Sequence, residues 1–177
     1  MKVAFFLGSF DPPHIGHGYV VSKALETMDF VVVVPTMQNP WKERKSTDFE
    51  IRCQMCEKTF LLLGESILIS DIEKTLEPPY YSYKTLKNLK EIWNSAELYL
   101  ICGNDVYDEI KNWKNSEWIF ENFKLLPVSR DIVTISSSQI RDMVKNDEHL
   151  SFLVTHNVEK IINENNFIND LFILYGF

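Results

Sequence analysis

Short apolar segments alternate with helix-like segments from the amino terminus to about residue 127. Strands are predicted at 3–7, 30–34, 67–70, 98–102 and 123–127, and helices at 15–28, 49–63, 82–93 and 117–122. Parallel strands need crossover connections, and these are usually helices. The alternation therefore predicts a parallel sheet with helices on both faces.

The last part of the sequence changes character. After three consecutive serines, Ser136, Ser137 and Ser138, a helix is predicted to about residue 146, and an amphipathic helix at 154–165. The length of 177 residues and the apolar content of 45% suit one domain with a full core. We therefore predict one α/β domain over residues 1–177, a Rossmann-like parallel sheet with a small C-terminal helical subdomain from about residue 136.

Charge and hydropathy limit the partners. A net charge of −7 and a pI near 5.1 disfavour a broad nucleic-acid surface, which needs a basic face. No apolar stretch reaches the length of a membrane span, and the first residues resemble a strand rather than a signal peptide. These features predict a cytoplasmic protein that binds neither nucleic acid nor membrane, and they leave a homo-oligomer open.

The three cysteines do not form a metal-binding pattern. Cys53 and Cys56 are spaced as CxxC, but they lie inside a predicted helix, and Cys102 is far away in the sequence. A structural zinc site normally needs four ligands. We interpret all three cysteines as reduced thiols.

The segment Gly-Ser-Phe-Asp-Pro-Pro-His-Ile-Gly-His at residues 8–17 follows the first predicted strand, and a helix is predicted from about Ile15. Gly8 lets the backbone approach a ligand, and the N–H groups of a helix N-terminus favour anions. His14 and His17 can each donate a hydrogen bond to a phosphate oxygen, and Gly16 between them leaves room for a nucleotide. A pair of ordinary surface histidines is the alternative, which this combination of features makes the weaker one.

Other candidate residues also follow predicted strands. Residues 35–45 follow the second strand and Gly103 follows the fourth. Ligands of open parallel sheets bind at the carboxyl ends of strands, where the strand order reverses. The sequence therefore predicts a phosphate-ligand site at this edge of the sheet.

The stretch His14-Ile15-Gly16-His17 resembles the HxGH signature of the nucleotidyltransferase superfamily. The string Ile135-Ser-Ser-Ser-Gln-Ile-Arg141 resembles the ISSTxxIR motif of its adenylyltransferases, with Ser138 where threonine is usual. The cytidylyltransferase motif carries a glycine that this string lacks, so the resemblance favours ATP over CTP. A plain serine N-cap is the structural alternative for Ser136 to Ser138.

Further stretches resemble the nicotinate and nicotinamide mononucleotide adenylyltransferases. Residues 39–42 (NPWK) resemble the PPHK loop of that family, with Arg52 and Met55 as its downstream RxxM. Residues 79–86 (PYYSYKTL) resemble PSYTxDTL, and residues 103–105 (GND) with Trp113 resemble GAD and its downstream Trp. The chain departs from the family at Trp41, which stands where histidine is usual, at Lys84, which replaces an aspartate, and in a shorter stretch between Arg130 and Ile135.

The resemblance implies transfer of AMP from ATP to nicotinate or nicotinamide mononucleotide by direct in-line attack, which forms the dinucleotide and pyrophosphate. It implies catalytic roles for His14, His17 and Arg141, and Mg²⁺ held mainly by ATP oxygens, without protein metal ligands. It implies ATP contacts at Gly8, Ser9, Phe10, Gly16, Ser136, Ser137 and Ser138. It implies mononucleotide contacts at Lys42, Ser82, Gly103, Asp105 and Trp113. For Asp105, a helix cap is an alternative to a ribose contact, and for Trp113 the alternative to stacking on pyridine is a place in the core.

Two other functions remain open at this point. One is an adenylyltransferase with another acceptor, such as phosphopantetheine or a sugar phosphate, and the other is a non-catalytic nucleotide sensor. On the expected pocket wall, Lys84 and Lys114 oppose Asp108 and Glu109. Because these charges roughly cancel, we expect weak discrimination between nicotinate and nicotinamide.

Overall fold

A computed structural model describes residues 1–38, 46–129 and 133–165, with only the backbone at 104 and 105. Its sheet contains β1 (Lys2–Gly8), β2 (Phe30–Pro35), β3 (Ile67–Ile69), β4 (Glu97–Gly103) and β5 (Lys124–Val128). The strand order is β3-β2-β1-β4-β5, and every neighbouring pair is parallel. The predicted α/β class and the five predicted strands are therefore confirmed.

Helices connect these strands. They are α1 (Ile15–Leu25), α2 (Phe49–Phe60), α3 (Ser82–Ile92), α4 (Asn104–Tyr107), α5 (Ser116–Asn122), α6 (Ser137–Lys145) and α7 (His156–Glu164). Short 3-10 turns η1 (Leu61–Leu63), η2 (Ile72–Thr75) and η3 (Ile110–Asn112) complete the described elements. The helix predicted to residue 63 changes to 3-10 geometry after Phe60, and Gly64 at φ 141° follows its end. The sequence did not predict α4, η2 and η3, because segments this short carry little periodicity.

Two apolar layers cover the sheet. Ala4, Val31 and Val33 face α1 and α2, whereas their neighbours Val3 and Val32 face the layer that includes α3 and α5. This alternation follows from the strand geometry, in which successive side chains point to opposite faces. Helices on both faces are therefore confirmed.

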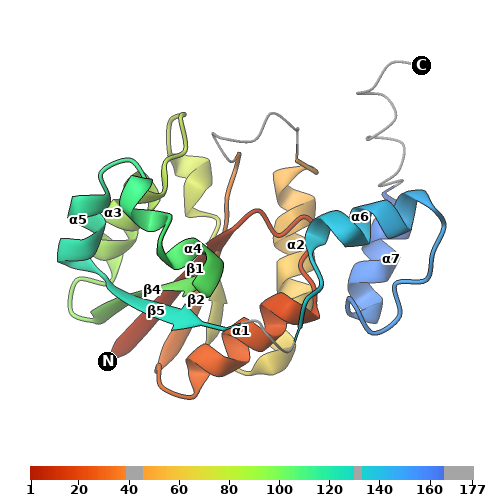
Figure 1. Cartoon of the computed structure of the whole chain (residues 1–177), viewed down its shortest axis with the longest axis horizontal. Helices are drawn as coiled ribbons and strands as arrows, with labels where there is room; N and C mark the ends of the chain where they lie inside the picture. The colour runs from red at the N-terminus through yellow and green to blue at the C-terminus, as the bar shows by residue number, and fades with distance from the viewer. Residues whose placement is uncertain (39–45, 130–132, 166–177) are drawn as a thin grey trace.

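The C-terminal helices form a third cluster beside α2. Ile140 and Val144 of α6 and Val158 and Ile162 of α7 pack with Met55 of α2. Figure 1 shows α6 and α7 together on the side of the molecule where α2 lies, away from α3 and α5. The predicted C-terminal helical subdomain is thus present over the described residues. No helix within them is long and apolar enough to cross a membrane.

The sheet opens between its central strand, β1, and the neighbouring strand β4. The pairs of β1 and β4 run from Lys2 with Glu97 to Phe5 with Leu100, although both strands continue to a glycine, Gly8 and Gly103. On the other side of β1, pairing with β2 continues to Gly8 with Pro35. The chain order reverses between β1 and β4, so this opening is the switch point at which open α/β sheets bind ligands.

Candidate active site

A cavity of about 330 Å³ lies at the opening between β1 and β4. Both strands line it, and so do the segments that follow them and the beginning of α3. The described lining residues are Phe6, Leu7, Gly8, Ser9, Phe10, His17, Val20, Thr36, Ser82, Leu100, Ile101, Cys102, Gly103, Val106 and Trp113. The cavity thus brings together seven of the predicted contact residues, Gly8, Ser9, Phe10, His17, Ser82, Gly103 and Trp113.

The turn after β1 is held by a buried aromatic ring. Phe10 is 2% exposed and has φ 45°, a left-handed conformation that is strained for a bulky residue. Its ring packs at near-perpendicular angles on Phe6, His17 and Phe60. A Cβ atom at Gly8 would lie 3.0 Å from the tip of this ring. Glycine at position 8 therefore lets Phe10 pack against the end of β1, so Phe10 supports the turn.

The two histidines cap α1 and fix each other's orientation. His14, which is 1% exposed, is the N-cap, and its Nδ1 accepts a hydrogen bond from the Gly16 N–H at 3.2 Å. Nδ1 of His17 accepts from the His14 N–H at 3.2 Å, and the ring centroids are 3.8 Å apart. A ring nitrogen that accepts carries no proton, so in the neutral rings the proton lies on Nε2. Each neutral ring can therefore donate only through Nε2.

Gly16 gives the His14 ring its place. A Cβ atom at position 16 would lie 3.0 Å from Cε1 and Nδ1 of His14, and 3.3 Å from Val133. Any other residue would therefore press on the ring. The predicted helix start at Ile15 is confirmed, and the alternative of two ordinary surface histidines does not fit the burial of His14.

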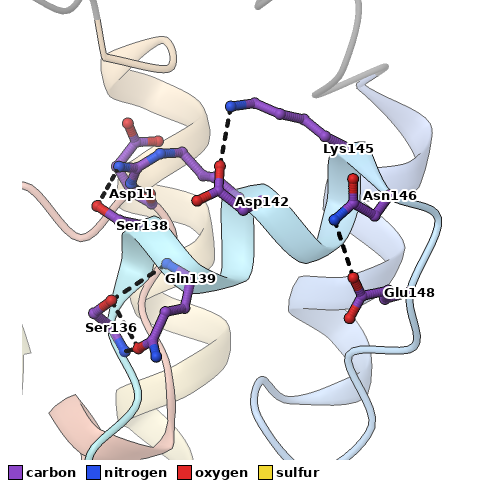
Figure 2. A network of polar contacts seen from close by, with 9 residues as sticks. Asp11, Ser136, Ser138, Gln139, Asp142, Lys145, Asn146 and Glu148 are labelled. Carbon is purple, nitrogen blue, oxygen red and sulfur yellow. Dashed lines mark hydrogen bonds and ion pairs between the residues drawn. The ribbon is translucent and has the colours of Figure 1, made fainter.

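The serine and arginine motif begins α6 and lies against the turn after Phe10. Arg141 donates through Nη1 to the Asp11 carbonyl at 2.6 Å and through Nη2 to Ser138 Oγ at 2.7 Å. Ser137 Oγ donates to the Pro12 carbonyl at 2.9 Å. Figure 2 shows Asp11 beside the first turn of α6, which contains Ser138. Two motifs that are far apart in the sequence therefore form one surface.

Ser136 is the helix cap that the structural alternative described. Its Oγ accepts from the Gln139 N–H at 3.2 Å, and the Gln139 side chain accepts from the Ser136 N–H at 2.8 Å (Figure 2). This reciprocal pair is a capping box, which satisfies two of the unpaired N–H groups at the start of α6. The Ser136 hydroxyl is thus engaged in the cap, beside Ser137, which contacts the turn after Phe10.

The predicted mononucleotide contacts divide into described and undescribed positions. Ser82, the first residue of α3, and Trp113, which follows η3, both line the cavity. Trp113 also packs partly on the core cluster, which agrees with its place in the core, while its stacking on a pyridine ring stays a prediction. Gly103, not Asp105, is the N-cap of α4, because the helix begins directly after β4. Lys42 and the side chain of Asp105 lie outside the described residues.

The prediction that these four charged residues form a wall of the pocket is wrong. Lys84, Asp108, Glu109 and Lys114 are not among the described residues that line the cavity. Lys84, in the first turn of α3, donates through Nζ to the Glu77 carbonyl at 3.2 Å. Weak discrimination between the two pyridine substrates thus needs another physical reason than cancelling side-chain charges.

The sequence analysis did not identify three buried polar residues behind the cavity as part of the site. Arg52, Glu73 and Thr85 are at most 1% exposed. Burial lowers the pKa of the Arg52 guanidinium, which the nearby Asp11 charge opposes. Burial raises the pKa of Glu73, and hydrogen bonds from Thr85 and the Met37 N–H oppose that shift. The RxxM motif pointed to Arg52 without a role, and no sequence signal distinguished Glu73 from a surface acid.

The three cysteines are free thiols, as predicted. Cys53, Cys56 and Cys102 are free and buried. Burial raises the pKa of Cys53 to about 11 and that of Cys56 well above its ordinary range. Among the described residues, no group of three or more His, Cys, Asp or Glu side chains is arranged to hold a metal ion.

The parallel sheet with a histidine helix cap at its switch point and a Ser/Arg helix start beside it agrees with the nucleotidyltransferase class that the motifs resemble. The family model described as "Cytidylyltransferase-like" matches residues 5–167, so the chain belongs to this family. Within it, the chain belongs with the nicotinate-nucleotide adenylyltransferases, as its curated relatives indicate.

One such relative, a probable nicotinate-nucleotide adenylyltransferase of Cytophaga hutchinsonii, is 30% identical and the match covers 92% of this chain and 95% of that protein. Another, from Aliarcobacter butzleri, is 36% identical over 66% of this chain and 65% of that protein. A crystal structure of a putative nicotinate-nucleotide adenylyltransferase from Vibrio parahaemolyticus has a TM-score of 0.78 at 23% identity, with 93% of each chain covered. This structural likeness confirms the Rossmann-like fold.

Proposed function

We propose that the protein transfers AMP from ATP to nicotinate mononucleotide, or to its nicotinamide counterpart, and forms the dinucleotide of NAD biosynthesis. The observation that carries this proposal is the cavity between β1 and β4, which gathers Gly8, His17, Ser82 and Trp113 beside the turn held by Arg141. The names of the relatives support the same reaction.

The reaction is a direct displacement. A phosphate oxygen of the mononucleotide attacks the α-phosphorus of ATP, the bond to the oxygen bridging the α- and β-phosphorus breaks, and pyrophosphate leaves with that electron pair. The proposal assigns no covalent nucleophile to the protein, so catalysis consists of positioning and stabilisation of charge. The Nε2–H groups of His14 and His17 donate to the α-phosphate and the bridging oxygen.

The start of α6 receives the leaving group in this proposal. Arg141, Ser137 and Ser138 bind the β- and γ-phosphates, and the first turn of α6 adds the positive end of its dipole. The Arg141 guanidinium donates to the Asp11 carbonyl and to Ser138 Oγ. Both contacts fix the plane of the guanidinium beside the turn, so part of its ordering cost is met before ATP binds. Gly8, Ser9, Phe10 and Gly16 shape the surface for the nucleotide.

The acceptor lies on the other side of the cavity. Trp113 supplies an aromatic face for the pyridine ring, and Gly103 allows a close approach of the ribose. The start of α3 at Ser82 meets the ring substituent, which is a carboxylate in nicotinate. Because a helix N-terminus favours an anion, nicotinate mononucleotide is the preferred acceptor in this proposal. Lys42 and Asp105, which the family resemblance adds, act on the acceptor's phosphate and ribose.

Magnesium enters with the triphosphate. Mg²⁺ prefers octahedral oxygen ligands and keeps several waters, so the phosphate oxygens of ATP hold it and supply charge neutralisation. Three buried free thiols suit the reducing cytoplasm, which we propose as the location.

A coupled assay tests the proposal. The purified chain is incubated with ATP, Mg²⁺ and one acceptor at a time: nicotinate mononucleotide, nicotinamide mononucleotide or phosphopantetheine. Both pyrophosphate and the dinucleotide are measured. We expect product with the pyridine mononucleotides only, and a loss of about 10²-fold in kcat for His17→Ala. Pyrophosphate release with phosphopantetheine alone would support the other acceptor class instead. A His17→Ala variant that loses only a few-fold, at unchanged ATP affinity, would favour the nucleotide sensor.

A further inference from the structure

A chain of buried polar contacts passes behind the cavity from α2 to α3. Its charged members are Arg52 of α2, which is 1% exposed, and Glu73 of η2, which is 0% exposed. Thr85 of α3, also 0% exposed, is its far end. None of the three is among the residues that line the described cavity. Their effect on the site can therefore pass only through the backbone that they hold.

Arg52 gathers the backbone that follows β1 and β2. Its Nη1 donates to the Ser9 carbonyl at 2.8 Å and to the Thr36 carbonyl at 2.7 Å, and Nη2 donates to the Met37 carbonyl at 3.0 Å. Its Nε donates to the Thr47 carbonyl at 2.8 Å. Ser9 and Thr36 are both cavity residues. One planar guanidinium thus sets the distance between two walls of the cavity, and it turns their carbonyl oxygens toward itself.

Glu73 continues the chain to α3. One carboxylate oxygen accepts from the Met37 N–H at 2.6 Å, and the other accepts from the Thr85 hydroxyl at 2.7 Å. Thr85 stands one helical turn after Ser82, the cavity residue at the start of α3. Glu73 therefore ties the segment after β2 to the helix that forms the third wall.

A packing role alone does not explain these residues. Burying a carboxylate and a guanidinium is costly, and apolar side chains of similar size usually fill a core at lower cost. Among the described residues, the side chains of Arg52 and Glu73 bond to Ser9 and Thr36 in the cavity wall, to Thr85 one turn after Ser82, and to Met37 and Thr47. The cost is understandable if the position of this backbone matters for binding.

We propose that Glu73 and Arg52 are positioning residues that hold Ser9, Thr36 and Ser82 at the spacing required by the mononucleotide. Glu73 with Thr85 serves the acceptor side, because its contacts reach Met37 and α3. Arg52 serves both substrates, because it also holds Ser9 in the turn that follows β1. The start of α6 is held by other contacts, from Arg141 and Ser137 to the Asp11 and Pro12 carbonyls.

This inference rests on the proposed function, and a matched pair of variants tests it. Thr85→Val removes the hydroxyl bonded to Glu73. Thr59→Val is the control, since Thr59 is a buried threonine whose hydroxyl donates only to the Met55 carbonyl of its own helix at 2.9 Å. We expect Thr85→Val to raise the KM for nicotinate mononucleotide roughly tenfold, with the KM for ATP within about twofold of the wild type. Calorimetric binding of the mononucleotide should weaken by the same factor, and Thr59→Val should change neither constant.

Glu73 variants separate geometry from charge. Glu73→Gln keeps an oxygen for the Met37 N–H and places an amide that can donate to Thr85 Oγ, so we expect the wild-type KM. Glu73→Asp is too short to reach both partners and should behave as Thr85→Val does, which also provides the test if Thr85→Val does not fold. An unchanged KM in folded Glu73→Asp, an equal rise for both substrates, or a loss in Glu73→Gln as large as in Glu73→Asp would overturn the proposal. A wild type that forms no dinucleotide would instead refute the proposed function.

Discussion

Replacement of Ser82 by proline tests how the protein distinguishes nicotinate from nicotinamide. The cavity wall of the described residues carries one ionisable ring, His17, and no Lys, Arg, Asp or Glu. The start of α3, where Tyr81 makes no side-chain cap, places a helix N-terminus at this wall. An anion at a helix N-terminus gains about 0.3–2 kcal/mol. Because about 1.4 kcal/mol is a factor of ten, nicotinate should be preferred by about two- to thirtyfold in kcat/KM.

Proline at the first position of a helix removes one N–H without breaking the helix. The preceding residue, Tyr81, has φ −76° and ψ 137°, which suits a residue before proline. Ser82→Pro should therefore move the ratio of the two kcat/KM values toward one, mainly through a weaker nicotinate reaction. Ser82→Ala, which loses only the hydroxyl, is the control and should keep the ratio.

Steady-state kinetics of both substrates, measured in one buffer with the three proteins, gives these ratios. Circular dichroism and the melting temperature verify that Ser82→Pro keeps α3. Equal ratios in Ser82→Pro and Ser82→Ala would refute the role of this N–H group. A wild-type preference above about a thousandfold would refute the dipole estimate, because it needs more than 4 kcal/mol.

Three further predictions follow from burial and close contact. Gly16→Ala should displace the His14 ring, because a Cβ atom at position 16 would lie 3.0 Å from it. We expect kcat to fall about 10²-fold with a small change in melting temperature. A wild-type kcat in the folded variant would contradict this prediction. Cys53 and Cys56 should react with a disulfide reagent at pH 8 at least about a hundredfold more slowly than a free thiol. The reason is that burial raises the pKa of Cys53 from 9.0 to about 11 and also raises the pKa of Cys56. Labelling should become fast in denaturant. Burial raises the pKa of Glu73 above 4.5, so its contribution to folding stability is complete below pH 4.5 and is lost as the pH rises through the folded pKa. The melting temperature of Glu73→Gln relative to wild type should therefore rise between pH 4 and pH 7. A constant difference would show that Glu73 ionises without cost.

Local patterns determined the elements and the main site motif. The alternation of strands and helices leaves few topologies, because parallel strands need crossovers and these have a fixed hand. The segment at residues 8–17 carries its own geometry, since Gly8 allows the turn and His14 caps α1 through its own ring. Such information lies within one turn of the chain, so the sequence was enough to predict it.

Relations between distant segments required the tertiary structure. The opening between β1 and β4 depends on where their pairing stops, and no residue pattern encodes that position. The sequence also placed four charged residues on the pocket wall that the described cavity does not contain, because the direction of an exposed side chain is not set by spacing alone.

The sequence by itself determined the α/β class, the order of the strands along the chain and the helix cap at residues 8–17, because each depends on local periodicity and backbone geometry. Only the tertiary structure revealed that Arg52 and Glu73 hold the walls of the cavity. The physical reason is that both act on backbone carbonyl and N–H groups, which every residue possesses. A buried charge that binds backbone therefore leaves no mark on the identity of its partners.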